Sequence, residues 1–596
     1  MERKYRFLLK VVMAIVASVG ITACSDLLET EGTRDLTDKD LSQKTDSMFM
    51  AYGIMQCMQQ LADQYVITGE MRGDLATTTY YSSESLRRIA DFSASAGDEY
   101  CSAAGYYAVI NNCNYYIAHR DTTLMTGSTN VVMNEYAAVK AFRAWAYLML
   151  ARNYGKVPFI TAPLTNISDM ENGTYPLLDL HEIVGRLAPD LEQYAGFSVP
   201  DYGSIPCGNT NLGQSKTVES RLCFIPVDVI LGEMYLEDGQ YERAAQHYIA
   251  YILANKLTTG NRTASVQTAL WNQGLTLPAD FNAATGSAWN SFFSNNGTDD
   301  IVTYIPMSVN RLRGSVTRVP KLFGYNYYAT SRDSLYTDAI QIVPSAAYTT
   351  MANAADYYYA TDAFGTTVKS IKIGDMRRAA TLMQGADTEA GGTEDDLSTG
   401  LPMMRKYNNA NIVLYRTTTV YLHLAEALNR MGYSDISFAI LKDGIDRQLL
   451  SAPYISESSK AALQGELALL SAENISIFDP ATGSSQTKVA YGIHKHGCGY
   501  TNGLFSPYQY ETVLREHASV LLTRQDTIDA MEEILCDEYA MEFAFEGGRF
   551  ADLCRIARHR NATQAGEGSR WLANKLSFKN PTKDLTDEKN WYMDFK

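Results

Sequence analysis

The sequence lacks the short motifs that mark the commonest nucleotide-binding and hydrolytic sites. It has no P-loop, no GxGxxG, no HExxH and no GxSxG. Each of these motifs sets backbone amides, metal ligands or a nucleophile at a spacing that its chemistry requires. A glycosidase would need two carboxylates across a cleft, and the sequence singles out no such pair among its acidic residues. We therefore predict that the chain is not an enzyme, and we assign no catalytic residue.

Positive charge is in deficit. The 51 Lys and Arg residues stand against 67 Asp and Glu, which gives a formal net charge of −16. Nucleic acids need a basic face to neutralise their phosphates, so this charge argues against a nucleic-acid partner. Tryptophan is scarce at 5, whereas tyrosine reaches 40. Tyrosine combines an apolar ring with a hydroxyl, which suits hydrated binding surfaces, although it also fills cores.

Long apolar runs are absent after the N-terminus. The one apolar run, residues 11–21, follows four basic residues within the first ten. It is too short to cross a hydrocarbon layer, which takes about 20 residues, so we predict a signal peptide over residues 1–23. It ends in Ile21-Thr22-Ala23-Cys24, which resembles the bacterial lipoprotein cleavage box. An ordinary secretory site that happens to carry a cysteine is the alternative. We predict lipidation of Cys24, a polar tether over residues 24–45 and a chain anchored to a membrane by lipid.

No CxxC pair occurs, so a zinc ribbon or a thioredoxin-like motif has no support. An exported chain meets an oxidising environment, in which Cys101 with Cys113, or Cys207 with Cys223, are candidates for short disulfide loops. Other cysteines, such as Cys536, have the pattern of small buried apolar residues.

Metal ligation has little support. The segment His494-Lys495-His496-Gly497-Cys498 has metal-capable side chains but no evident further ligand. Residues 295–300 offer oxygen atoms to Ca²⁺ but do not follow the twelve-residue calcium-loop spacing. We predict no metal and no cofactor, with a bound Ca²⁺ as an unsupported alternative.

Apolar periodicity predicts a mainly α fold. Residues 134–153 are apolar nearly all round, which indicates a helix buried on several sides. The segment from Leu231-Gly232 to Tyr235 has the L-G-x-x-Y core of a tetratricopeptide repeat. Ala244 and Tyr248 follow in phase, and a glycine separates the two helices. Residues 421–432 repeat this pattern. The pattern predicts a tetratricopeptide-like helical repeat scaffold.

A change of composition interrupts this scaffold. Residues 258–419 are rich in Gly, Thr, Asn, Ala and Tyr, with short runs such as 301–306 and 370–373 that suit strands. A long irregular excursion in a compact domain is uncommon unless it has a use. We predict one domain over residues 46–596. Its scaffold covers about 46–257 and 420–560, a ligand-binding insert covers about 258–419, and a second polar excursion covers about 451–510.

Near the C-terminus, acidic residues precede a glycine pair and basic residues follow it. Glu538, Glu542 and Glu546 recur every four residues on a predicted helix that Gly547-Gly548 ends. We predict that the chain then folds back, so that Glu542 or Glu546 pairs with Arg549 or Arg555 in a partly buried setting. The structural set is Glu542, Glu546, Arg549, Asp552 and Arg555, and we interpret it as structural rather than catalytic.

The same stretch resembles the C-terminal signature of the RagB/SusD family, in which a Glu-rich helix runs into F-E-x-x-R-[aromatic]-x-D-L-x-R. The matching positions are Phe545, Glu546, Arg549, Phe550, Asp552, Leu553 and Arg555. Phe550 stands where Trp or Tyr is more usual. Residues 69–74, GEMRGD, resemble the family's early GE-[apolar]-RGD segment, and their two glycines predict a tight turn. YGKVP (154–158) and YLHLAEALNRMG (421–432) match further family segments.

The resemblance implies a function as well as a fold. It implies four tetratricopeptide-like helix pairs and an irregular ligand-binding face. It also implies a lipoprotein on the outer-membrane surface that binds nutrient, typically glycan, and acts in uptake as a lid on a SusC-type TonB-dependent transporter. A surface glycan-degrading enzyme, and an adhesion or scaffold lipoprotein whose repeat groove binds proteins, are the alternatives.

Aromatic residues in irregular segments are the candidates for ligand contact. A flat ring covers the apolar C–H face of a sugar while polar side chains bond its hydroxyls. Tyr80 and Tyr81 follow the GEMRGD segment, where family members often place binding aromatics, and Trp289, Tyr327 and Tyr328 lie in the insert. The alternative for each ring is packing in a satellite core under the long loops.

Overall fold

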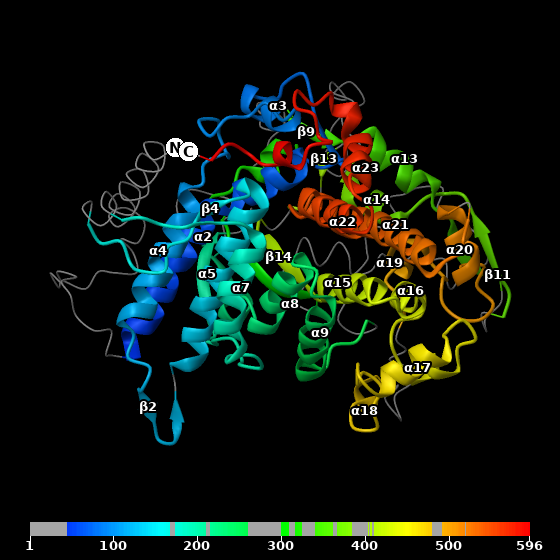
Figure 1. Ribbon diagram of the computed structural model, residues 1–596, viewed down its shortest axis with the longest axis horizontal. Coiled ribbons are helices and arrows are strands. Elements are labelled where there is room, and N and C mark those ends of the chain that lie inside the picture. The colour runs from blue at the N-terminus through cyan, green and yellow to red at the C-terminus, as the bar shows by residue number, and fades with distance from the viewer. Residues whose placement is uncertain are drawn as a thin grey trace.

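Helices make up most of the secondary structure, as the sequence predicts (Figure 1). The computed structural model describes residues 44–130, 132–166, 173–209, 215–259, 300–308, 316–324, 340–361, 366–383, 403–404, 406–407, 410–478, 491–518 and 520–595. The predicted signal peptide, Cys24 and nearly all of the tether lie outside these ranges. None of the helices within them is both long enough and apolar enough to cross a membrane.

The N-terminal part of the scaffold consists of α2 (Lys44–Met71), α4 (Ala104–His119), α5 (Met133–Tyr154) and α7 (Leu180–Glu192). α4 packs against α2 and α5, and α7 packs against α5. α5 is buried on nearly all sides, as predicted, and its Trp145 is 1% exposed. Gly155 ends α5 with a φ of 72°, a conformation that glycine adopts at little cost.

The predicted helix pairs are present in the middle of the chain. α8 (Val227–Glu237) packs against α9 (Tyr241–Asn255), and Gly239 turns the chain between them with a φ of 74°. A Cβ atom on Gly232 would lie 2.5 Å from the ring of Tyr248, so the glycine allows the two helices to approach. A second pair, α15 (Thr417–Arg430) and α16 (Ser434–Lys442), continues the scaffold because α15 also packs against α9.

The chain closes with α21 (Arg524–Phe543), α22 (Arg549–Thr563) and α23 (Glu567–Leu576). The prediction that the glycine pair ends α21 is wrong, because the helix ends at Phe543 and Phe545 already has a φ of 70°. Glu70 explains the early end. Its carboxylate accepts the backbone N–H groups of Phe545 at 3.0 Å and Gly547 at 2.7 Å, which draws this turn toward α2.

The GEMRGD segment forms the predicted tight turn between its glycines. α2 continues through Gly69 to Met71, and Gly73 N–H closes the turn by donating to the carbonyl of Glu70 at 3.0 Å. A Cβ atom on Gly69 would lie 1.8 Å from the carbonyl oxygen of Gly547. Gly69 is therefore needed for the close contact between α2 and the turn before α22, not for a turn of its own.

The predicted pairing of Glu542 or Glu546 with Arg549 or Arg555 is wrong. Glu542 pairs with Arg377 at 2.8 Å and Arg416 at 2.7 Å, and Glu546 pairs with Arg416 at 3.2 Å. Glu546 also pairs with Lys406 at 2.6 Å. These cations come from the insert and its end at α15, so neither carboxylate pairs with a basic residue of α22.

The basic residues after the glycine pair have other partners. Arg549 pairs with Asp74 at 2.7 Å, while Arg555 pairs with Glu426 of α15 and with Asp552, each at 2.8 Å. The chain does fold back in one place, because Arg560 of α22 pairs with Glu532 and Glu533 of α21. All five predicted residues form ion pairs, and four of them pair with distant segments instead of joining α21 to α22, whereas Asp552 pairs with Arg555 within α22.

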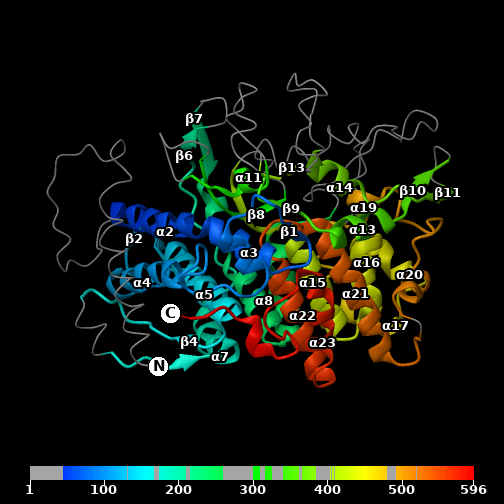
Figure 2. The same cartoon turned by 90° about the horizontal axis from the view of Figure 1, so that it is seen from above.

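The strands are short and pair two by two, all antiparallel. The pairs are β1 (Ala76–Thr78) with β9 (Ile342–Pro344), β2 (Met125–Thr126) with β3 (Thr129–Asn130), β4 (Val157–Pro158) with β5 (Leu177–Leu178), β6 (Ser204–Asn209) with β7 (Ser215–Glu219), β8 (Ile301–Ile305) with β14 (Ile412–Arg416), β10 (Tyr357–Ala360) with β11 (Val368–Ile371), and β12 (Leu382–Met383) with β13 (Met403–Met404). Short helices accompany them: α3 (Glu84–Ala90), α11 (Val319–Leu322), α13 (Ala346–Ala354), α14 (Met376–Thr381), α17 (Glu457–Gln464), α18 (Ile475–Phe478), α19 (Lys495–Cys498) and α20 (Tyr510–His517). Figure 2 shows β6, β7, α11 and α14 on one side of the scaffold and α7, α22 and α23 on the other.

Neither candidate disulfide is formed. All eight cysteines from Cys57 to Cys554 are unbonded and buried. Cys113 faces the core from α4 and is 0% exposed, and burial raises the pKa of its thiol. These cysteines act as small apolar core residues.

Candidate ligand-binding site

Tyr80 and Tyr81 form the most exposed aromatic pair in the described part of the chain. They lie on the loop between β1 and α3, and their exposed fractions are 87% and 54%. Their ring centroids are 5.5 Å apart, with the rings nearly perpendicular at 87°. α3 begins directly after them because Ser83 caps it, accepting the N–H of Leu86. The alternative that these two rings fill a satellite core is therefore excluded.

Hydrogen bonds hold the backbone beneath the rings. Arg87 of α3 donates from Nη2 to the carbonyl of Tyr80 at 2.5 Å and from Nε to the carbonyl of Ser82 at 3.2 Å. The backbone N–H of Thr79 donates to Ser82 Oγ at 2.7 Å. Two exposed rings on a hydrogen-bonded loop lose little conformational freedom when they meet a ligand, which favours binding.

The insert supplies a second set of contacts to this loop, where β9 pairs with β1. Thr79 Oγ1 donates to the carbonyl of Ile340 at 2.6 Å, and Ser83 N–H donates to Gln341 Oε1 at 3.0 Å. The second bond fixes the orientation of the Gln341 amide. Its Nε2 makes no hydrogen bond to another described residue, and the side chain is partly exposed. Gln341 is thus an oriented donor held at the loop that carries the two rings (Figure 1 shows α3 next to β9).

The sequence predicted the two tyrosines but not Gln341 or Arg87. Gln341 lies in the insert, far from Tyr80 in sequence, and no motif marks it. The other predicted aromatics, Trp289, Tyr327 and Tyr328, lie outside the described residues.

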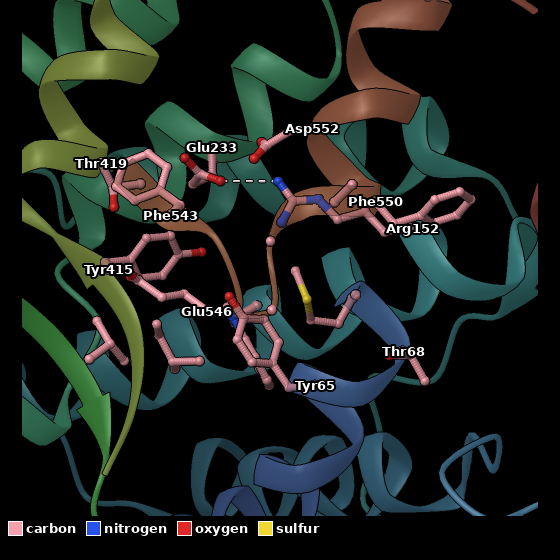
Figure 3. Close-up of a pocket in the computed structure, with 18 of the residues that line it drawn as sticks. Tyr65, Thr68, Arg152, Glu233, Tyr415, Thr419, Phe543, Glu546, Phe550 and Asp552 are labelled. Atoms are coloured by element: carbon pink, nitrogen blue, oxygen red, sulfur yellow. Dashed lines mark hydrogen bonds and ion pairs between the residues drawn. The ribbon is translucent and has the colours of Figure 1, made fainter. Parts of the chain in front are cut away.

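A cavity of about 70 Å³ lies deeper in the protein, where α2, α5, α8, β14, α15 and the turn before α22 meet (Figure 3). Pockets for small-molecule ligands measure roughly 300–1,000 Å³, so this cavity cannot enclose a sugar. A sugar-sized ligand therefore does not fit in this cavity.

Charged side chains around the cavity are paired with one another. Arg152 pairs with Glu233 at 3.0 Å and Glu237 at 2.8 Å, and His423 bonds the other oxygen of Glu233. Burial disfavours the charged form of His423, but Glu233 outweighs it and raises the pKa of His423 to about 9. The same histidine and Arg152 overcome burial and lower the pKa of Glu233. These groups are charged at neutral pH and stabilise each other.

The histidines of the metal-capable segment contact glutamates. His494 contacts Glu538 at 2.7 Å, and His496 contacts Glu542 at 3.1 Å, while Arg377 bonds both glutamates. The described residues include no group of three or more His, Cys, Asp or Glu side chains that could hold a metal ion. Both glutamates are at most 4% exposed, so they are not accessible as a glycosidase pair.

The predicted calcium segment lies outside the described residues except for Asp300. That carboxylate accepts from Arg416 Nη2 at 2.7 Å and from the backbone N–H of Thr418 at 3.0 Å. Its oxygens are engaged in joining the insert to α15.

Comparisons with known proteins identify the fold. No family model and no curated protein matches the sequence. Among solved structures, a SusD superfamily protein from Bacteroides thetaiotaomicron VPI-5482 is 13% identical, with a TM-score of 0.53 over 92% of this chain and 95% of that one. The surface glycan-binding protein A from Bacteroides fluxus is 14% identical, with a TM-score of 0.50 over 92% and 94%. The chain has the fold of the SusD superfamily.

Proposed function

We propose that this protein binds a glycan at the cell surface through Tyr80 and Tyr81. The observation that carries the proposal is the exposure of these two adjacent rings, 87% and 54%, on a loop fixed by hydrogen bonds. The fold supports it, because a protein of the same fold is a surface glycan-binding protein. The motifs shared with the RagB/SusD family point the same way.

The geometry suits a sugar ring. The apolar C–H face of a sugar packs on an aromatic face, and its hydroxyls need hydrogen-bonding groups at the rim. Because the two rings are nearly perpendicular, they form a corner that contacts a sugar residue from two directions. Gln341, whose amide is bonded to Ser83 of the same loop, supplies a donor, and the tyrosine hydroxyls supply further polar groups.

The test is calorimetry with Tyr80→Ala and Tyr81→Ala, using soluble amylopectin, laminarin, xylan and pectin as ligands. Aromatic stacking on nucleic-acid bases is worth about 1–3 kcal/mol per ring, and a sugar contact should be similar or weaker. We expect each variant to lose roughly tenfold in affinity for the glycan that the wild type binds. The melting temperature should hold, because an exposed ring contributes little to packing.

A matched control is Phe505→Ala, which removes a ring that is 61% exposed on the loop between α19 and α20. This variant should keep full affinity. If Tyr80→Ala and Tyr81→Ala also keep full affinity, the binding face lies elsewhere on the protein.

We further propose that the protein acts without catalysis, as an outer-membrane lipoprotein that works with a SusC-type TonB-dependent transporter in nutrient uptake. The lipoprotein-like box at Cys24 and the family resemblance support this role. Purification from membranes under mild detergent should recover a transporter with the protein. Release of new reducing ends from a bound glycan would contradict the non-catalytic assignment.

A further inference from the structure

The cavity of about 70 Å³ has a polar lining that protein groups alone do not satisfy. Tyr415 of β14 is 4% exposed, and its hydroxyl points into the cavity (Figure 3). Tyr65 of α2 also lines it. Neither hydroxyl hydrogen-bonds to another residue in the described part of the chain.

The surroundings of these hydroxyls are charged. Burial raises the pKa of Tyr65, and the charges that act on its hydroxyl are those of Arg152, Asp552, Glu233 and Glu546. Burial likewise raises the pKa of Tyr415, with Glu233 as the next cause. Both hydroxyls therefore face the same group of charged side chains.

Two physical arguments identify what fills such a space. A buried hydroxyl without a partner costs about 1–3 kcal/mol, so the fold is more stable if something bonds it. A water molecule needs roughly 10–15 Å³ of such cavity volume and 2–4 polar partners. The cavity accommodates about five waters by this measure, and its lining offers enough donors and acceptors.

We propose that this cavity is a binding site for a cluster of ordered water molecules. The cluster joins α2, β14 and the turn before α22 through Tyr65, Tyr415 and Glu546. Water then adds to the direct bonds that Glu70 makes between α2 and the turn before α22. Glycan binding at Tyr80 and Tyr81 does not depend on this site.

The test is a high-resolution crystal structure of the wild type, solved with and without xenon pressure. Dry apolar cavities bind xenon, whereas hydrated polar ones do not. We expect water density within about 3 Å of Tyr415 Oη and no xenon. Density for xenon or an ion, or no density in the cavity, would overturn the proposal.

Two variants sharpen the result. Tyr415→Phe should lose the water next to that ring and keep the waters near Glu546. Tyr421→Phe is the matched control, because its buried hydroxyl donates directly to the carbonyl of Leu257 at 3.0 Å, so the waters should stay unchanged. If Tyr415→Phe fails to fold, the wild-type structures alone decide.

Discussion

The Asp74–Arg549 ion pair joins two segments that lie 475 residues apart in the chain. Arg549 Nε lies 2.7 Å from Asp74 Oδ1, its Nη2 lies 3.0 Å from Oδ2, and both side chains are at most 4% exposed. In Arg549→Met the carboxylate stays buried without its cation, which costs about 3–5 kcal/mol of unfolding free energy. Asp74→Asn leaves the guanidinium unpaired in the same way. The double variant should cost less than the two single costs added together, by about 1–3 kcal/mol.

The assay is urea denaturation of the purified protein, with the free energy of unfolding measured for the wild type, both single variants and the double variant. The control is the same cycle on Arg318 and Glu99, whose side chains are 53% and 47% exposed. That pair should contribute about 0–1 kcal/mol, because water screens it. The reasoning is refuted if Arg549→Met costs no more than Arg318→Met, or if the two cycles give the same coupling energy.

Three further predictions concern the α2 contact, the cavity charges and the anchor. Gly69→Ala should destabilise the protein by about 1–3 kcal/mol, because its Cβ would lie 1.8 Å from the carbonyl oxygen of Gly547. In the same helix, a Cβ atom on Gly53 would have no atom within 4 Å, so Gly53→Ala should stabilise the protein by about 0.5–1 kcal/mol. Equal effects of the two substitutions on stability would contradict the close approach of Gly69 to Gly547. His423, whose pKa rises from 6.5 to about 9, should stabilise the fold fully below pH 6.5 and lose that contribution as the pH rises through 9. The difference in unfolding free energy between wild type and His423→Gln should therefore shrink by up to about 3 kcal/mol between pH 6 and pH 9.5. A difference that stays constant over this range would show that the neighbouring carboxylate does not raise the pKa of His423. Cys24→Ala should release the protein from membrane fractions or stop its processing, and normal attachment of that variant would count against a lipid anchor.

Local features of the fold could be predicted from the sequence because they depend on neighbours in the chain. The burial of α5 follows from its nearly uniform apolar composition. The pairing of α8 with α9 follows from Gly232, Ala244 and Tyr248 at the spacing of a tetratricopeptide repeat. These patterns need no knowledge of distant segments.

The ion pairs could not be predicted in the same way. Glu542 and Arg549 are close in sequence, yet they bond Arg377 and Asp74, which come from other parts of the chain. Charges spaced four residues apart lie on one face of a helix. The spacing does not indicate which segment of the chain packs on that face. The early end of α21 has the same cause, because Glu70 bonds the turn from 475 residues away.

The candidate site could be predicted in part. Tyr80 and Tyr81 were identified by their position after the GEMRGD segment, and the structure places both rings on the surface. Gln341 and Arg87 were missed because their roles depend on the path of the backbone. Arg87 bonds carbonyl groups, which the sequence does not distinguish, and Gln341 reaches Ser83 only through the pairing of β9 with β1.

The motifs that reveal the fold are distinct from the residues that would select a ligand. Glu70, Asp74 and Arg549 belong to the matching segments, and all are at most 3% exposed because they join α2 to the turn before α22. A ligand cannot reach such residues, so their chemistry is set by the packing of the scaffold. Tyr80 and Tyr81 are exposed on a loop and Gln341 is partly exposed just before β9, where substitutions cost little stability. A ligand of this loop therefore has to be identified by binding measurements, because the matching segments report only the scaffold beneath it.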